Sequence, residues 1–161
     1  MNARIAPMQR GRVLALGLAA GFALLGSDPC GPLPGSELSG EVVTEPVGDW
    51  SFAAEVRHCQ VELQPEEPYS VTTYCYPDGA VIYVPAIMGD DKRWTKLAVE
   101  NPQARLRVGE RIYPVTLERV LDPEERREAA LAGHRRRHEG DVPPEDFELD
   151  DDTWYFRATS R

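Results

Sequence analysis

The chain has 161 residues, of which 42% are hydrophobic and 28% are charged, and its formal net charge is −9. This length suits one domain with a real core and is short for two domains. An acidic chain lacks the basic surface that neutralises phosphates, so nucleic-acid binding is excluded as a function. Fourteen prolines and thirteen glycines favour a turn-rich β architecture over a helical bundle.

Residues 1–29 have the pattern of a signal peptide or membrane anchor. Arg4, Arg10 and Arg12 precede an apolar run from Val13 to Leu25. A charged segment followed by an apolar run of this length is typical of an export signal, and the run is short for a membrane span. We therefore predict export to the cell envelope. The chain after residue 29 keeps 15 basic and 26 acidic residues, a net charge of −11.

Cys30 follows the apolar run and precedes GPLPGSELSG, which predicts a flexible stalk over residues 30–48. This arrangement resembles a bacterial lipoprotein, in which the cysteine carries diacylglycerol and attaches the protein to membrane lipid. Three alternatives stay open: lipidation of Cys30, ordinary cleavage near Gly26–Ser27, and an uncleaved anchor. Among them we favour association with the membrane.

Residues 49–161 are expected to form one β-rich domain, after a short strand over Glu41–Val47. Trp50–Leu63 and Tyr69–Tyr76 are rich in β-branched and aromatic residues, and the QPEEP segment between them predicts a turn. A hairpin folded about this turn places Cys59 opposite Cys75 within one residue, which is within reach of a disulfide. An oxidising compartment favours that disulfide, and two buried free thiols are the alternative.

The rest of the chain continues the alternation of strands, tight turns and two helices. A Trp-Leu-Ala face at helical spacing predicts the first helix, which Asn101–Pro102 would end. Asp122 followed by Pro-Glu-Glu predicts the start of the second. The expected elements are a strand at Ala80–Ala86, a helix at Arg93–Glu100, a hairpin of Ala104–Val108 and Arg111–Val120, a helix from Asp122 to about His138, and a strand at Thr153–Ala158. Antiparallel neighbours joined by tight turns predict a small closed or partly open barrel.

No recognisable catalytic or metal-binding motif stands out. His134 and His138 have the spacing of two metal ligands on a helix, but three arginines lie between them and no third ligand is evident. We interpret them as a solvated helix end and predict no metal site. The sequence leaves the catalytic residues unknown.

The segment IYVPAIMGDDKRWTKLAVENPQARLRVGERIYPVTLERVLDPEER, Ile82 to Arg126, resembles a known group of proteins. Its order of strand, basic loop, Trp, short helix, Asn-Pro, strand, Gly turn, strand and Asp-Pro helix is similar to that of the split β-barrel flavin- and deazaflavin-binding superfamily. This superfamily includes pyridoxamine-phosphate-oxidase-like proteins and deazaflavin-dependent nitroreductases. The resemblance implies a mainly β (α+β) fold, a six- to seven-stranded antiparallel split β-barrel with two peripheral helices.

The resemblance also implies a cofactor, FMN or a deazaflavin, and an oxidoreductase activity if the protein is an enzyme. Backbone groups of Ile82, Tyr83 and Val84 would line the isoalloxazine ring. The alternative function is a cofactor-free cell-envelope protein that keeps the barrel as a binding or interaction scaffold, because a fold alone does not fix a function. The partners to consider are a small-molecule ligand and a second copy of the chain in a homodimer.

In the same comparison, Lys92 and Arg93 would contact the cofactor phosphate, and Trp94 would begin the helix beneath it. A helix N-terminus favours an anion, because its unpaired N–H groups and its dipole act together with cationic side chains. Arg105 and Arg107 share one face of the following strand, and we expect that face to be the exterior of the barrel.

Overall fold

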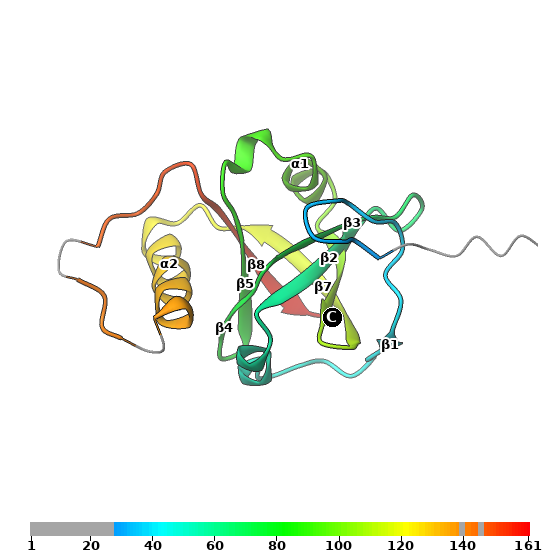
Figure 1. Cartoon of the computed structure of the whole chain (residues 1–161), viewed down its shortest axis with the longest axis horizontal. Coiled ribbons are helices and arrows are strands. Elements are labelled where there is room, and N and C mark those ends of the chain that lie inside the picture. Colours follow the sequence, from blue (N-terminus) through cyan, green and yellow to red (C-terminus); the bar gives the residue numbers. More distant parts are fainter. Residues whose placement is uncertain (1–27, 139–140, 145–146) are drawn as a thin grey trace, which may run out of the picture.

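The computed structural model describes residues 28–138, 141–144 and 147–161 (Figure 1). The predicted export signal lies outside the described residues, except for Asp28 and Pro29. Among the described residues, no helix is both long and apolar enough to cross a membrane. The elements, with η for a short 3-10 helix, are β1 (Glu41–Val42), η1 (Ser51–Glu55), β2 (His58–Leu63), β3 (Tyr69–Tyr74), β4 (Tyr76–Asp78), β5 (Val81–Ala86), η2 (Gly89–Asp91), α1 (Arg93–Glu100), β6 (Gln103–Val108), β7 (Arg111–Arg119), α2 (Pro123–Arg137) and β8 (Trp154–Ser160).

One curled antiparallel sheet has the strand order β3-β2-β6-β7-β8-β5-β4. Its two outermost strands, β3 and β4, are consecutive in the chain and are separated only by Cys75. The sheet therefore curls until its ends meet at this corner, with a seam between β3 and β5. Across the seam, the Thr73 hydroxyl donates to the carbonyl oxygen of Pro85 at 3.0 Å. The predicted mainly β fold, an antiparallel barrel with two helices, is confirmed.

A disulfide joins Cys59 of β2 to Cys75 at the corner, as predicted, with 5.9 Å between the Cα atoms. The register differs from the expected one, because the residue paired with Cys59 is Thr73. Cys75 therefore lies diagonally across from Cys59 on the same face of the sheet. The bend after β3 brings this diagonal pair closer than the roughly 7–8 Å usual in a flat sheet.

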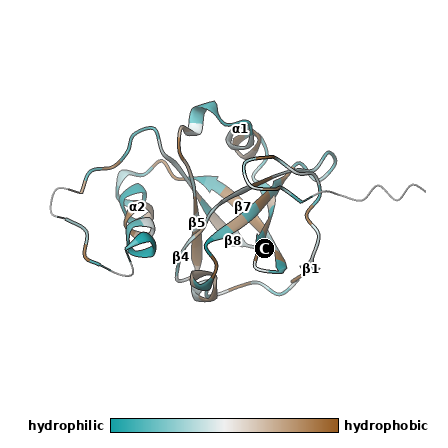
Figure 2. Cartoon of the chain, viewed as in Figure 1, coloured by the Kyte–Doolittle hydropathy of each residue, from teal (hydrophilic) through white to brown (hydrophobic). Residues whose placement is uncertain are grey.

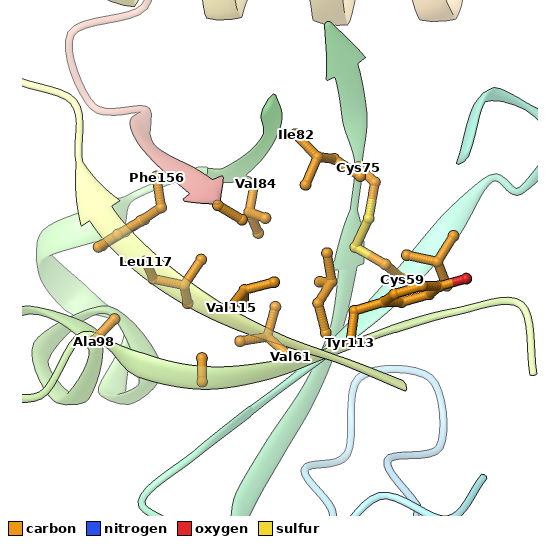
Figure 3. Close-up of a cluster of buried hydrophobic side chains, with 14 of the residues drawn as sticks. Cys59, Val61, Cys75, Ile82, Val84, Ala98, Tyr113, Val115, Leu117 and Phe156 are labelled. Carbon is orange, nitrogen blue, oxygen red and sulfur yellow. A yellow bond between two sulfur atoms is a disulfide. The ribbon is translucent and has the colours of Figure 1, made fainter. Parts of the chain in front are cut away.

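The core fills the inside of the barrel (Figure 3). Alternate residues of each strand point inward, as the two-residue period of a strand requires. At the two ends of the barrel, Trp94 of α1 and Trp50 beside η1 join the same core. The fully buried side chains drawn in Figure 3 include Val61, Ile82, Val84, Val115, Leu117 and Phe156.

The segment before β2 corrects one prediction. Trp50–Leu63 was expected to be a single strand, but Ser51–Glu55 forms the 3-10 helix η1 and β2 starts only at His58. The Asp49 carboxylate accepts the Ser51 backbone N–H at 2.8 Å, which turns the chain at this point. Trp50 is then fully buried, with its ring 5.2 Å from that of Tyr113. The aromatic residues that suggested a strand instead close the end of the barrel.

Both α-helices form where the sequence predicts them. α1 spans Arg93–Glu100, as expected, and ends before Asn101–Pro102. α2 begins at Pro123 after Asp122, whose carboxylate accepts the Glu125 backbone N–H at 2.9 Å. α2 covers the outer face of β4, β5 and β8 with small residues that pack on three tyrosines, namely Ala129, Ala130, Ala132 and Gly133 on Tyr76, Tyr83 and Tyr155. Figure 2 shows the contrast between hydrophobic β5 and the largely hydrophilic α2.

Residues 28–43, which we call the strap, run along the outside of β3, β2 and β6, on the side of the barrel away from α2 in Figure 1. Gly35 and Ser70 exchange two backbone hydrogen bonds of 2.9 and 3.0 Å. β1 lies near the end of the strap and pairs in parallel with the start of β7. The sequence predicts a flexible stalk over residues 30–48, whereas in the structure the strap contacts the barrel both at Asp28 and Pro29 and from Gly35 onward.

Candidate functional site

The candidate site is the junction between β5 and α1. After β5, the chain turns at Ile87 and Met88, which are 58% and 50% exposed. Met88 has a left-handed backbone conformation, with φ of 52°, and η2 follows directly. Two apolar side chains are therefore open to solvent immediately before the cations of α1. Sequence reasoning missed this pair, although its place between Pro85-Ala86 and Gly89 indicates a turn.

Buried contacts hold this junction in place. The Thr95 side chain is fully buried, and its hydroxyl lies within hydrogen-bonding distance of the carbonyl oxygens of Gly89 and Lys92. Gly89 donates its N–H to Asp152 at 3.0 Å. A Cβ at Gly89 would lie 2.2 Å from Cγ of Trp154, so only glycine fits against this ring. The turn that leads into α1 is thus fixed by both β8 and the helix.

Positive charge gathers at the start of α1. Lys92 is the half-buried N-cap residue, and Arg93 is exposed with its guanidinium 4.5 Å from the ring centre of Tyr69. No side chain in the described part of the chain caps α1. The first-turn N–H groups and these two cations can therefore act together on an anion.

Two carboxylates, Asp90 and Asp91, stand beside these cations and are both exposed. Asp90 interacts electrostatically with Arg119, whose guanidinium stacks 3.2 Å from the ring centre of Trp154. Burial lowers the pKa of Arg119, and the negative charge of Asp90 opposes that shift. Asp91 is the carboxylate that directly precedes Lys92 in the chain.

The three residues predicted to line a cofactor ring are enclosed by the protein itself. The side chains of Ile82 and Val84 point into the core, and both are fully buried. Tyr83 points outward but lies under α2, where burial, then Glu125, Glu128 and Asp78 raise its pKa to about 12. β5 pairs with β8 along one edge. Along the other edge it pairs with β4, as far as Tyr83.

Lys92 and Arg93 thus follow the exposed residues Ile87 and Met88 by way of η2, whereas the side chains of Ile82, Tyr83 and Val84 are enclosed. Trp94 is 6% exposed and packs on Phe156 with 5.2 Å between ring centres, so it supports the helix from below. The contact of a ring with the 82–84 backbone stays a prediction. A ligand bound at the junction would therefore contact the exposed turn at Ile87 and Met88.

Two small cavities lie elsewhere, beside the strap. One of about 160 Å³ is lined by residues that include Glu37, Glu62, Arg105 and Arg161. The other, of about 200 Å³, is lined by residues that include His58, Gln60, Thr72 and Arg107. Both are smaller than the roughly 300–1,000 Å³ of typical ligand pockets. Neither is lined by a residue of the β5–α1 junction.

Metal ligands do not gather anywhere in the described ranges, where no group of three or more His, Cys, Asp or Glu side chains could hold a metal ion. The rings of His134 and His138 stack with 4.4 Å between their centres. Desolvation, together with His138 and Arg137, lowers the pKa of His134. The two histidines are therefore part of the cationic C-terminal end of α2.

The fold has known counterparts among solved structures, although the sequence matches no known protein family and no curated protein. A pyridoxamine-5'-phosphate-oxidase-like protein of Listeria innocua superposes with a TM-score of 0.53 at 12% identity, covering 68% of this chain and 88% of that one. A candidate 5-nitroimidazole antibiotic resistance protein of Bacteroides thetaiotaomicron gives a TM-score of 0.52 at 12% identity, with 72% and 82% covered. The resemblance to the split-barrel superfamily is thus confirmed at the level of the fold.

Proposed function

We propose that the protein binds an anionic cofactor of the flavin or deazaflavin type at the β5–α1 junction and, when loaded, acts as an oxidoreductase. The observation that carries this proposal is the placement of Lys92 and Arg93 at the uncapped start of α1, next to exposed Ile87 and Met88. A cofactor of this type joins a flat aromatic ring to a phosphate, so it needs such a combination of apolar and cationic groups. Bound there, the ring would supply hydride transfer.

The fit differs between the two ends of such a cofactor. The phosphate end fits, because two cations and the first-turn N–H groups of α1 are available. At the ring end, the side chains of Ile82, Tyr83 and Val84 are enclosed, so the exposed side chains open to a ring are those of Ile87 and Met88. The roles of the chain's own residues are then to bind the phosphate through Lys92 and Arg93 and to hold the junction rigid through Thr95 and Gly89.

Titration of the purified protein with FMN and with riboflavin tests this proposal, because the two ligands differ only by the phosphate. We expect FMN to bind at least about tenfold more tightly, which corresponds to about 1.4 kcal/mol. The double variant Lys92→Gln/Arg93→Gln should abolish that preference. A matched control, Arg111→Gln/Arg135→Gln, removes two exposed cations far from the junction and should keep it.

Asp91→Asn refines the test in the opposite direction. It removes the carboxylate next to Lys92, so the affinity for FMN should rise while that for riboflavin stays constant. If FMN, riboflavin and a phosphate-bearing deazaflavin all fail to bind the unmodified protein, the proposed function is wrong.

A cofactor-free binding protein of the cell envelope is the second candidate. The observation in its favour is that α2, β4 and β8 enclose the central part of β5. On this reading the barrel is a scaffold, and Asp90 and Asp91 keep phosphates away from α1. An unchanged ligand profile in the Lys92→Gln/Arg93→Gln variant would support this candidate over the first.

Export belongs to the proposal as well. One support is the apolar run at Val13–Leu25, which follows three arginines and lies outside the described residues. The other is the disulfide, which an oxidising compartment favours. Fractionation of the producing cell, with the protein detected in each fraction, tests it. Recovery in the cytosol alone, with the N-terminal run intact, would contradict export.

A further inference from the structure

The strap is held to the barrel by two ion-paired anchors, and the first is buried. Glu62 of β2 is only 4% exposed and accepts two hydrogen bonds from Arg105, at 2.8 and 2.6 Å. The backbone N–H of Leu38 donates to the same carboxylate at 2.6 Å, and Leu38 itself is 3% exposed. This anchor fixes the middle of the strap.

The second anchor uses residues that precede Cys30. The Asp28 carboxylate accepts hydrogen bonds from Nη1 of Arg107 at 2.8 Å, and from the N–H and hydroxyl of Ser39 at 2.9 and 2.7 Å. The carbonyl oxygen of Pro29 accepts from the Gln60 amide at 3.1 Å. Although partial burial acts to raise it, the hydrogen bonds from Ser39 and Arg107 hold the pKa of Asp28 below its ordinary value. Asp28 and Pro29 thus take part in the fold.

Between the two anchors, Cys30 lies in a tight turn. It exchanges two backbone hydrogen bonds with Leu33, at 3.2 and 3.0 Å, and the chain already pairs with Ser70 at Gly35. Even if this turn opened, the five steps from Cys30 to Gly35 would reach only about 17 Å. A lipid on Cys30 would therefore hold the barrel directly at the membrane.

We infer that Asp28 and Pro29 belong to the folded domain and stay on the mature chain. Any peptide bond that water cleaves during export then lies before Asp28, and Cys30 remains an internal residue with a free thiol. Cleavage directly before Cys30 would remove the carboxylate from Arg107 and the acceptor from Gln60. The inference rests on the predicted export and does not depend on the proposed cofactor.

Mass spectrometry of the protein from its own host tests the position of the cut. We expect the N-terminal peptide to contain Asp28 and Pro29, and Cys30 to react with iodoacetamide after denaturation. An N-terminal peptide that starts at Cys30, diacylated or not, would overturn the inference.

A double-mutant cycle in the host-produced protein tests the structural role. Asp28→Asn and Arg107→Gln should each lower the melting temperature by about 2–5 °C, and the double variant should fall no further than the single ones. Arg111→Gln, in a pair that is 62% and 74% exposed, is the control and should change it by less than about 1 °C. Strictly additive effects, or no effect of either single variant, would show that Asp28 is not an anchor.

Discussion

The barrel has two covered outer faces, and they are covered by different chemistry. On one side, the strap lies over β3, β2 and β6 and is held by the Leu38 N–H on Glu62, itself paired with Arg105, and by Asp28–Arg107. On the other, α2 lies over β4, β5 and β8 and packs small residues on a cluster of tyrosines. The strap side depends on charge pairs whose strength changes with ionic strength and partner, whereas the α2 side depends on close apolar packing.

Buried polar atoms without a hydrogen-bond partner occur on both sides. Within the described residues they include the Ser70 hydroxyl and Oε1 of Gln60 on the strap side and Nε of Arg136 in α2. On the α2 side, burial raises the pKa of Tyr76, Tyr83 and Tyr155. A segment held by a few polar contacts is easier to lift than a helix packed on aromatic rings, so we expect the strap to exchange its amide protons faster than α2.

Removal of the disulfide should have the largest effect, because Cys75 lies at the corner where the two covered faces meet. The Cys59→Ala/Cys75→Ala variant removes a bond between two residues that are 16 positions apart in the sequence. We expect a loss of about 3 kcal/mol in the free energy of unfolding, measured by urea denaturation. Reduction of the unmodified protein should produce a similar loss. A variant as stable as the unmodified protein would show that the corner does not depend on the bond.

Arg105→Met should be the next largest change, and it weakens the strap side only. It leaves the buried Glu62 carboxylate without its cation, at an expected cost of roughly 2–3 kcal/mol, which is below the roughly 3–5 kcal/mol usual for a fully buried pair because Arg105 is 26% exposed. Urea denaturation at neutral pH measures this loss. The double variant Glu62→Gln/Arg105→Met should recover part of the stability. Recovery of none would argue against the pair as the source of the effect.

Gly133→Val tests the α2 side. A Cβ at Gly133 would lie 2.6 Å from the Tyr76 ring, so the larger side chain must displace either the helix or the tyrosine. We expect a loss of about 1–3 kcal/mol, from the same denaturation experiment. Glu128→Val introduces the same side chain at an exposed position of α2 and should cost only a few tenths of a kcal/mol. Equal losses in the two variants would contradict the close packing.

The Tyr83 phenol should have the smallest effect of all, because its contribution to stability changes with pH only in the alkaline range. Because the pKa of Tyr83 is raised to about 12, the folded state keeps this phenol protonated after the unfolded state has lost its proton near pH 10. The contribution of Tyr83 to stability is therefore fully present below pH 10 and is lost as the pH rises toward 12. Thermal melts across this range should show a weaker pH dependence for Tyr83→Phe. Identical curves for the two proteins would refute the assignment.

Local patterns were enough to predict most of the elements. The bounds of α1 follow from the spacing of its apolar residues and from Asn101–Pro102, and the start of α2 follows from Asp122 and Pro123. The register of the β6–β7 hairpin follows from the Gly109–Glu110 turn, where Gly109 has φ of +63°. These signals act within a few residues, so the sequence alone carries them.

Other features depend on residues far apart in the chain. The strap has no periodic pattern of its own, and its order comes from contacts such as that between Arg107 and Ser39, which are 68 residues apart. At the candidate site, Lys92 and Arg93 could be predicted as a cationic cluster. The enclosure of Tyr83 could not, because the small-residue face of α2 has no meaning until its tyrosine partners are known.

The visible absorption spectrum of the protein, purified from its own host without added cofactor, tests the proposed function most directly. Occupancy of the β5–α1 junction predicts the absorption bands of a flavin or a deazaflavin, which the Lys92→Gln/Arg93→Gln variant purified in parallel should lose. A colourless protein that also fails to take up FMN or a deazaflavin would contradict the cofactor-binding proposal and leave the barrel as a binding scaffold.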